Sequence, residues 1–276
     1  WQNLVVPGGQ MCAVDFATAV ELPEPLGLAA RFTEAGLVGE LDWPHGQPLG
    51  DASILTRRAT LLPRWTGAGR TRKWVVGPDA VLARGAQGGG GVVSRTQQQR
   101  SAVIKSLQTQ GDWPTSPTLV GWTPAIEDGL SDETVPQARG SALWVTPLSI
   151  EPAPPGSRVT VPWPMVAMTS LRSMPGLEGM PPQYDPREDA WSEMSLPSRV
   201  FVMFTLPDAV RPLSIDQATL LLGIEAIGRP VRILSSVQGE VVELARLDSP
   251  DGLQRIDLPV DQLDGQDGHI RIAIDV

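Results

Sequence analysis

The sequence predicts a mainly β protein made of two sandwich-like units, with one short helix inserted in the first. Short apolar stretches recur through its 276 residues, separated by 28 glycines and 27 prolines, which favours strands joined by turns. In the last third of the chain the stretches recur at roughly 10-residue spacing, typical of a β-sandwich or small barrel. Proline breaks helices, and its spread from Pro7 to Pro259 excludes long helical bundles and coiled coils.

The first unit is predicted to span residues 1–168 as a β-rich domain. Turn residues such as Pro7-Gly8-Gly9 separate its apolar stretches, and a hairpin is expected around Gly77-Pro78-Asp79. Residues 112–136 are rich in Pro, Thr and Asp, which favours an ordered loop. The expected strands cover residues 4–6, 13–16, 26–32, 37–41, 54–62, 74–76, 80–83, 142–150 and 158–166.

One helix is predicted near residues 95–110 of this unit. Ser94 can accept hydrogen bonds from the free backbone N–H groups of the first turn, and Gly111 can end the helix. Ala102, Val103 and Leu107 recur at helical spacing, so we expect them to form the face that contacts the domain.

A Pro- and Met-rich segment, residues 169–197, is predicted to link the two units. It holds five prolines and three methionines, and it keeps neither the period of a helix nor that of a strand. Few backbone hydrogen bonds are expected to protect such a segment. The domain boundary is therefore placed here.

The second unit, residues 198–276, is predicted to be a β-sandwich of about seven strands. Ile270, Ile272 and Ile274 alternate with polar or small residues, as one buried face of a strand requires. This layout is similar to immunoglobulin-like or jelly-roll modules, but no motif in it identifies a family. The clearest expected strands cover residues 199–206, 218–224, 231–235, 241–247, 254–258 and 269–276.

An internal similarity relates the two units. Ala59-Thr60-Leu61-Leu62 recurs as Ala218-Thr219-Leu220-Leu221, and the pair Gly69-Arg70 recurs at the same offset as Gly228-Arg229. Either the units arose by duplication, or two β-rich stretches share common residues by chance.

Composition excludes several classes of protein. The formal net charge is −9, so the field of the protein disfavours binding to a nucleic-acid backbone. The single cysteine, Cys12, cannot form an internal disulfide. No apolar run approaches the roughly 18 residues of a membrane span, so membrane attachment is expected only through flanking segments. Because the sequence opens at Trp1, we expect a processed protein or an excised soluble fragment.

The residues that commonly carry catalysis are sparse. The two histidines, His45 and His269, are expected at turns or strand edges, and motifs of zinc proteases, zinc ribbons, nucleophile-elbow hydrolases and P-loops are absent from the sequence. Two acidic clusters remain, one in the linker and one before the last strand. They suggest a carboxylate pair or a calcium loop, or else solvated turns, and the turns are favoured, so no metal or cofactor is expected. The clusters are Asp185, Glu188 and Asp189, and Asp261, Asp264 and Asp267.

A basic cluster with interleaved tryptophans is the strongest candidate for a binding site. Arginine beside an indole can stack on a sugar or on an aromatic side chain of a partner. The simpler alternative is the solvated face of two strands, with both tryptophans packed inward. The cluster comprises Arg57, Arg58, Arg64, Arg70, Arg72 and Lys73, and the residues predicted to bind a partner or ligand are Trp65, Arg70, Arg72 and Trp74.

The sequence therefore favours a non-enzymatic structural or protein-interaction module. We expect it to form the extracytoplasmic part, periplasmic or cell-surface, of a larger envelope assembly whose other members are proteins. A carbohydrate-binding module that uses Trp65 or Trp74 is the first alternative. A hydrolase that uses carboxylates such as Asp185 and Glu188 is the second.

Overall fold

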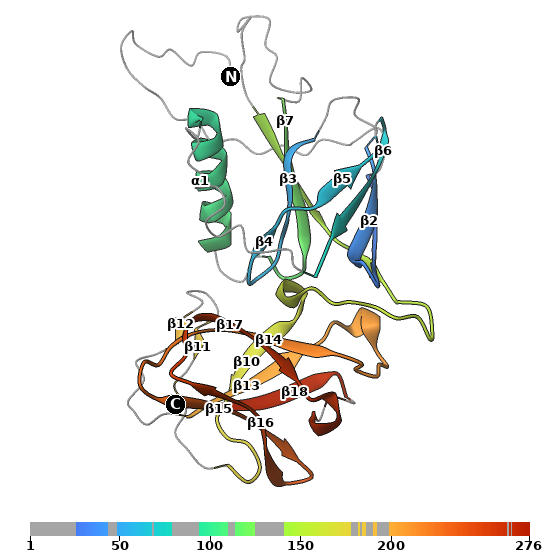
Figure 1. Ribbon diagram of the computed structural model, residues 1–276. Coiled ribbons are helices and arrows are strands. Elements are labelled where there is room, and N and C mark those ends of the chain that lie inside the picture. The colour runs from blue at the N-terminus through green and yellow to red at the C-terminus, as the bar shows by residue number, and fades with distance from the viewer. Residues whose placement is uncertain are drawn as a thin grey trace, which may run out of the picture.

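The protein is mainly β, with several antiparallel sheets and one α-helix among the residues described, so the predicted fold class is confirmed at this level (Figure 1). The predicted strands at residues 4–6, 13–16 and 80–83 lie outside the described residues. The computed structural model describes residues 26–43, 49–67, 69–78, 94–109, 114–124, 141–177, 182, 184–185, 190–191, 199–263, 265 and 267–276.

In the first unit, two sheets enclose one hydrophobic core. The first sheet has the order β5-β6-β2-β1-β9 and is antiparallel except for the β1–β9 pair, and the second has the order β4-β3-β7-β8. The strands are β1 (Gly27–Thr33), β2 (Gly36–Asp42), β3 (Gly50–Leu55), β4 (Thr60–Leu61), β5 (Arg64–Thr66), β6 (Thr71–Val76), β7 (Thr118–Pro124), β8 (Ser141–Pro147) and β9 (Ile150–Glu151).

The core of the first unit is built around an indole. Trp74 is only 2% exposed and packs with Phe32 and Leu37 of the first sheet and with Ile54 of the second. A Cβ at Gly39 would lie 2.1 Å from Cζ2 of Trp74, so the indole lies over β2 only because this position has no side chain.

Four predictions for the first unit are wrong. Residues 142–150 are not one strand, because β8 ends at Pro147 and β9, which begins at Ile150, belongs to the other sheet. Residues 54–62 are not one strand, because Thr56 Oγ1 accepts the backbone N–H groups of Arg58 (3.2 Å) and Ala59 (3.0 Å) and turns the chain between β3 and β4. Residues 118–124 are not loop but strand β7, which pairs with both β3 and β8. Residues 158–166 are not a strand, since Pro162 and Pro164 lack the N–H groups that a ladder needs.

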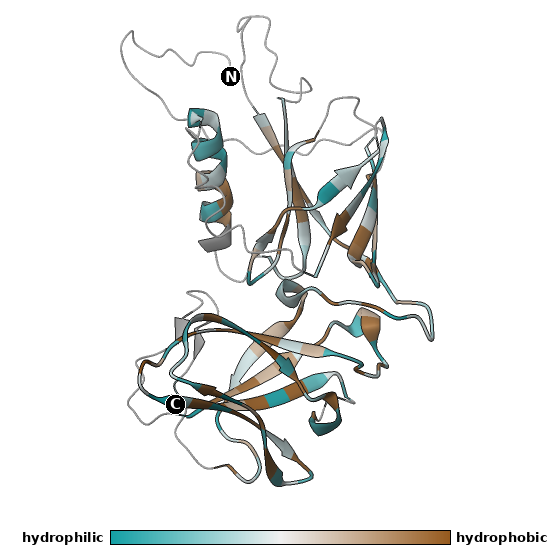
Figure 2. Cartoon of the chain, viewed as in Figure 1, coloured by the Kyte–Doolittle hydropathy of each residue, from teal (hydrophilic) through white to brown (hydrophobic). Residues whose placement is uncertain are grey.

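Helix α1 (Arg95–Thr109) confirms the predicted helix and its cap. Ser94 Oγ accepts the backbone N–H of Gln97, and the Gln97 side chain accepts the backbone N–H of Ser94, both at 3.2 Å. The predicted contact face is wrong in part, because Ala102 and Val103 are exposed and the half-buried positions are Arg100, Ser101, Ile104 and Leu107. Figure 2 shows hydrophilic residues along much of α1, so its apolar contact with the sheets is small.

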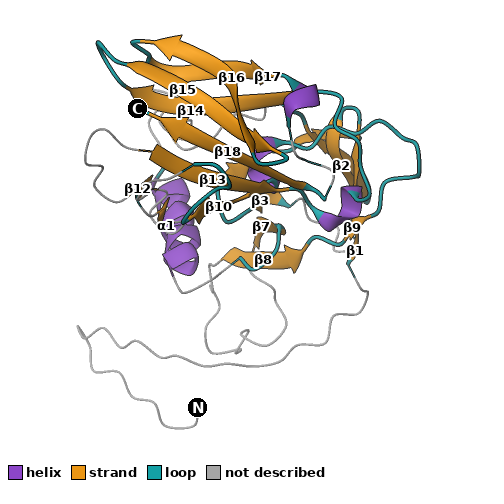
Figure 3. Cartoon of the chain, turned by 90° about the horizontal axis from the view of Figure 1, so that it is seen from below, coloured by secondary structure: helices purple, strands orange, loops and turns teal. Residues whose placement is uncertain are grey.

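The second unit pairs a five-stranded sheet with a two-stranded ribbon. The sheet has the order β10-β13-β18-β15-β16, and the ribbon β14–β17 packs over one of its faces (Figure 3). Val202, Ile233 and Ile272 of the sheet meet Leu220 and Ile256 of the ribbon in the core. The strands are β10 (Ala167–Leu171), β13 (Arg199–Thr205), β14 (Ala218–Glu225), β15 (Pro230–Val237), β16 (Glu240–Asp248), β17 (Asp251–Leu258) and β18 (His269–Asp275).

All six strands that the sequence predicts here are present. The other face of the sheet is partly buried too, because Met174 and Leu177 cover Phe201, Leu234 and Ala273. Two short strands, β11 (Tyr184–Asp185) and β12 (Ala190–Trp191), pair with each other, and three 3-10 turns complete the described elements: η2 (Trp163–Met165), η3 (Asp208–Val210) and η4 (Val260–Gln262).

The predicted linker differs from the structure at its start. Residues 169–171 belong to β10, which pairs with β13. Met165 and Val210 are buried in the core of the first unit, although Val210 follows β13 of the second. The division of the chain into two domains therefore stays a prediction, with segments that cross the expected boundary.

The two units meet at Arg58. Its Nη2 contacts Sδ of Met168 in β10 of the second unit at 3.9 Å, and its Nη1 donates to the carbonyl of Val166, directly before that strand, at 3.2 Å. Its guanidinium also lies over the ring of Trp163, 4.9 Å from the centroid. One residue of the predicted basic cluster is thus part of the junction between the units.

Candidate functional site

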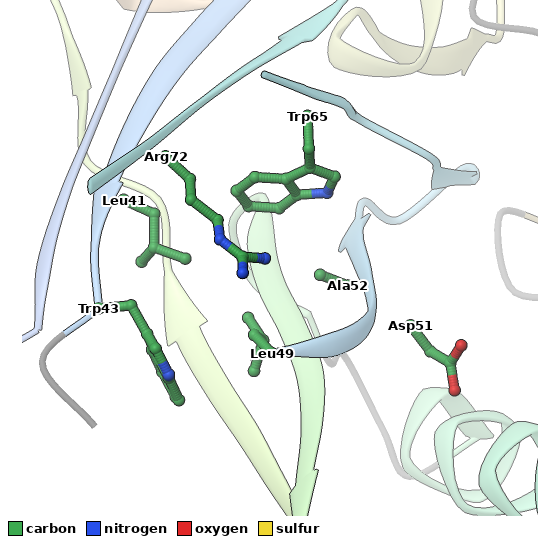
Figure 4. A pocket seen from close by; sticks show the side chains of 7 residues that line it. All are labelled: Leu41, Trp43, Leu49, Asp51, Ala52, Trp65 and Arg72. Carbon is green, nitrogen blue, oxygen red and sulfur yellow. The ribbon is translucent and has the colours of Figure 1, made fainter. Parts of the chain in front are cut away.

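A pocket of about 260 Å³ opens at one end of the first unit's core (Figure 4). Its walls are mostly apolar, with two indoles, one guanidinium and one carboxylate. Strands of both sheets and the segments that border them contribute. The lining residues are Leu41, Trp43, Leu49, Asp51, Ala52, Trp65 and Arg72.

Strand register places an arginine at an inward position. Arg72, Trp74 and Val76 alternate along β6, and the latter two are buried in the core. Leu41 of β2 lies opposite Arg72, and Trp65 of β5 lies opposite Trp74. Arg72 therefore continues the row of core-facing residues to the mouth of the pocket, where its side chain lies beside Trp65 (Figure 4).

Arg72 makes no hydrogen bond or ion pair with any residue that the structure describes. It is half-buried, and the other six lining residues include only one with an opposite charge. Apolar neighbours remove part of the water around a guanidinium, and this loss of hydration costs free energy unless an anion pairs with the group. The pocket therefore offers a positive group that a bound carboxylate or phosphate can engage.

The carboxylate of Asp51 is turned away from the pocket. The register of β3 against β7 shifts between Gly50 and Ser53, and Asp51 has a φ of 47°, a left-handed backbone that few non-glycine residues adopt. Figure 4 shows its side chain directed toward α1, where it pairs with Arg100 at 2.6 Å. This bulge ties the rim of the pocket to the helix.

Arg100 also connects the helix to strands β7 and β8 of the second sheet. It donates to Ser141 Oγ at 3.3 Å and lies over the ring of Trp122, 5.3 Å from the centroid. No residue of α1 is fully buried among those described, so the contacts of Arg100 add to the partial burial of Ile104 and Leu107 in attaching the helix.

Trp43 provides a rigid wall. It is buried and makes an edge-to-face contact with Trp144, at a centroid distance of 4.8 Å and an angle of 79°. Trp144 Nε1 in turn donates to Thr123 Oγ1 at 2.9 Å. The two indoles hold each other in one orientation, so the apolar side of the pocket is formed in advance of any ligand.

The four predicted binding residues are placed in different surroundings. Trp65 and Arg72 both line the pocket, whereas Trp74 is buried beneath it. Arg70 lies at the turn before β6 and donates to both carboxylate oxygens of Asp42, at 2.7 and 3.1 Å. The hydrogen bond from Arg70 holds the pKa of Asp42 below its ordinary value.

Sequence reasoning missed five of the seven lining residues. Trp43, Leu49, Asp51 and Ala52 lie on segments that meet β5 and β6 only after the sheets form. Leu41 could have been found from the apolar alternation of residues 37–41, had the pairing of that strand with residues 71–76 been known.

The acidic clusters are only partly described. Glu188, Asp189 and Asp264 lie outside the described residues, and Asp267 accepts the backbone N–H of His269 at 2.9 Å. That hydrogen bond, together with the nearby Arg271, holds the pKa of Asp267 below its ordinary value against the effect of burial. Within the described part of the chain, no group of three or more His, Cys, Asp and Glu side chains is placed to hold a metal ion.

The histidines and the helices give no further site. His45 lies outside the described residues, and His269 Nδ1 lies 3.0 Å from Thr205 Oγ1 across two paired strands. Among the described helices, none is both long and apolar enough to cross a membrane.

Comparison with protein-family models, with curated proteins and with solved structures gives no match for this chain. The pocket beside Arg72 combines two indoles, an arginine and an apolar wall at one place on the described surface.

Proposed function

We propose that the protein is a non-enzymatic interaction module whose pocket binds a protein partner in a larger extracytoplasmic assembly. Arg72, half-buried and without a partner among the described residues, is the observation that carries the proposal. Arginine and tryptophan are the residues that most often dominate the energy of protein interfaces. Here both types line one preformed, mostly apolar pocket.

The pocket chemistry favours a partner segment with an apolar side chain next to a carboxylate. Leu41, Leu49 and Trp43 offer an apolar surface, and the Arg72 guanidinium at the mouth can take a carboxylate through two parallel hydrogen bonds. The Asp51 carboxylate does not compete, because it is paired with Arg100.

Carbohydrate binding is the second candidate, and Trp65 is the observation that favours it. This indole is half-buried at the pocket, so one part of its ring is open to a sugar that would stack on it. A hydrolase needs two carboxylates around one bond. The single carboxylate of this pocket is directed elsewhere, so catalysis is not proposed here.

Titration of the two-dimensional NMR signals of the tryptophan Nε1–H groups tests both candidates. The probes are acetyl-Leu-Glu-amide, its uncharged counterpart acetyl-Leu-Gln-amide, and the disaccharide cellobiose. We expect the acidic peptide to shift the signals of Trp43 and Trp65, with an affinity at least fivefold weaker for the Gln peptide because a bond to a charged group is lost.

Arg72→Gln should remove this preference, whereas Arg64→Gln, at an exposed position of β5, should keep it. Equal shifts with the Glu and Gln peptides, or a preference that survives Arg72→Gln, would overturn the proposal. Shifts caused by cellobiose alone would replace it with carbohydrate binding.

A further inference from the structure

A second, shallower pocket of about 440 Å³ lies on the five-stranded sheet of the second unit. The end of β18 lies beside β15 there (Figure 3), in register with Asp275 opposite Arg232. The lining residues are Arg229, Pro230, Arg232, Arg246, Asp275 and Val276. Three arginines and one aspartate give this pocket two positive charges in excess, in a protein whose net charge is −9.

A row of charged side chains crosses four neighbouring strands at this level. Arg199 of β13 and Arg232 of β15 both lie opposite Asp275 of β18. Asp275 accepts hydrogen bonds from both, at 3.1 Å from Arg199. Burial alone would raise the pKa of Asp275, but the bonds from the two guanidinium groups outweigh it and hold the pKa below its ordinary value. This carboxylate is therefore ionised, and its Oδ2 accepts from both arginines.

The next position in the row repeats the positive charge. Arg246 of β16 lies directly opposite Arg232, on the exposed side of the sheet. Like charges placed directly opposite each other destabilise a pair of strands. The carboxylate nearest to Arg246 is that of Asp248, at 3.4 Å, and it is 85% exposed, so it offsets little of this repulsion.

Arg229 adds a third guanidinium at the turn before β15. Its side chain is exposed and makes no ion pair with the residues that the structure describes. The β15–β16 pairing holds the backbones of Arg232 and Arg246 at fixed positions, and the Arg229 carbonyl accepts the backbone N–H of Ser249 at 3.0 Å.

We propose that Arg229, Arg232 and Arg246 bind a tetrahedral dianion, a phosphate or a phosphate monoester. The planar guanidinium fork matches the geometry of phosphate oxygens, and the excess of two positive charges among the lining side chains matches a dianion better than a single carboxylate. Binding also relieves the repulsion between Arg232 and Arg246. The site is in another unit from the Arg72 pocket and does not depend on the function proposed for it.

Thermal unfolding at constant ionic strength tests the site. Inorganic phosphate, phenyl phosphate and acetate are compared in chloride buffers, so that general screening of charge stays the same. We expect phosphate or phenyl phosphate to raise the Tm, with a Kd on the order of 1 mM for an exposed site. The tighter of the two identifies the free anion or the monoester as the ligand.

Arg246→Gln has two expected effects of opposite sign. Without phosphate its Tm should rise by roughly 1–3 °C, because the like-charge pair is gone. With phosphate, the Tm of this variant should still rise, but the apparent affinity for phosphate should be about tenfold weaker than in the wild type. Arg229→Gln should lose the phosphate response without the first effect, and Arg64→Gln, exposed in the other unit, should change neither.

The proposal is overturned if the wild type shows no saturable response to either phosphate. It is overturned equally if Arg246→Gln and Arg229→Gln respond like the wild type, or if acetate acts as strongly as phosphate. A loss of the response in Arg64→Gln as well would show a general charge effect and would also refute the site.

Discussion

The two units bury their cores with different chain paths. The core of the second unit draws its buried residues from Val200 to Ile274, nearly all on strands that follow one another along the chain. The core of the first unit extends from Ala30 to Val210 and is completed by Met165 of η2 and Val210 of η3. Part of the first core therefore cannot form until the chain has reached the second unit.

This difference has a consequence for independence. A unit whose core comes from one continuous segment can fold by itself, whereas a core completed by later segments depends on them. Arg58 strengthens this dependence, since its Nη1 donates to the carbonyl of Val166, directly before β10, and its Nη2 contacts Sδ of Met168 in that strand at 3.9 Å. We therefore expect the first unit to be the dependent partner.

The largest expected effect tests the continuous core. Ile272 of β18 is fully buried between the sheet and the ribbon. Ile272→Ala should lower the free energy of unfolding by about 2–5 kcal/mol, because it removes buried apolar contacts and leaves a cavity. Urea unfolding followed by circular dichroism measures the loss.

Arg271→Ala is the matched control on the same strand. Its side chain is one-third exposed and contacts Asp267 at 3.4 Å, so the expected loss is under about 1 kcal/mol. Equal losses at the two positions would mean that the face of β18 that carries Arg271 contributes as much to the free energy of unfolding as the face that carries Ile272.

A smaller effect tests the junction. Arg58→Ala should cost about 1–2 kcal/mol, since it removes a hydrogen bond from a charged group and a contact with an indole. Of the tryptophans that the structure describes, all but Trp191 of β12 lie in the first unit or at its junction, so tryptophan fluorescence reports mainly on these parts. The isoleucine methyl signals of β18 report on the second.

We expect the fluorescence transition of Arg58→Ala to move to lower urea while the methyl transition stays near its wild-type position. Arg57→Ala, at the exposed neighbouring position, should leave both unchanged. If both probes of Arg58→Ala move together, the units unfold as one and the proposed dependence is wrong.

The same difference explains what the sequence could predict. In the second unit, runs of apolar residues between turns, such as the alternating Ile270, Ile272 and Ile274, predict six of the seven strands of the sheet and the ribbon, and only β10 is missed. In the first unit, the turn at Thr56 depends on a single hydroxyl that bonds the backbone N–H groups of Arg58 and Ala59, and β7 is stabilised by partners on both sides. Neither signal can be read from a local apolar pattern.

The internal similarity does not extend to structure. Residues 59–62 contain only the two-residue strand β4, whereas residues 218–221 lie within the eight-residue strand β14. Gly69 and Gly228 both adopt positive φ, at 92° and 74°, as many turns require. The matching glycines therefore reflect the same backbone requirement in two turns, and the matching segments do not have the same secondary structure.

The candidate site is predictable only in part for the same reason. Trp65 and Arg72 are close in sequence, so the amino-acid sequence alone shows a cluster of arginine and tryptophan. The residues that make it a pocket come from β2, β3 and the segments beside them. Whether an arginine faces the core or solvent depends on register, and here register places Arg72 inward and Arg70 at the turn with Asp42.

The smallest expected effect tests the charged row of the second unit by its pH dependence. The pKa of Asp275 is lower in the folded protein than its ordinary value of 3.8, so its contribution to stability is present above about pH 4 and is lost as the pH falls through the folded-state pKa. Asp275→Asn should cost about 1 kcal/mol at pH 7, since its arginine partners are partly exposed. The difference from the wild type should shrink toward pH 2 in urea unfolding.

Asp216→Asn is the control. Its carboxylate is 64% exposed, so this variant should differ little from the wild type at either pH. A wild-type minus Asp275→Asn difference that stays constant from pH 7 to pH 2 would show that the ionised carboxylate does not stabilise the row, and that packing alone holds β18 between β13 and β15.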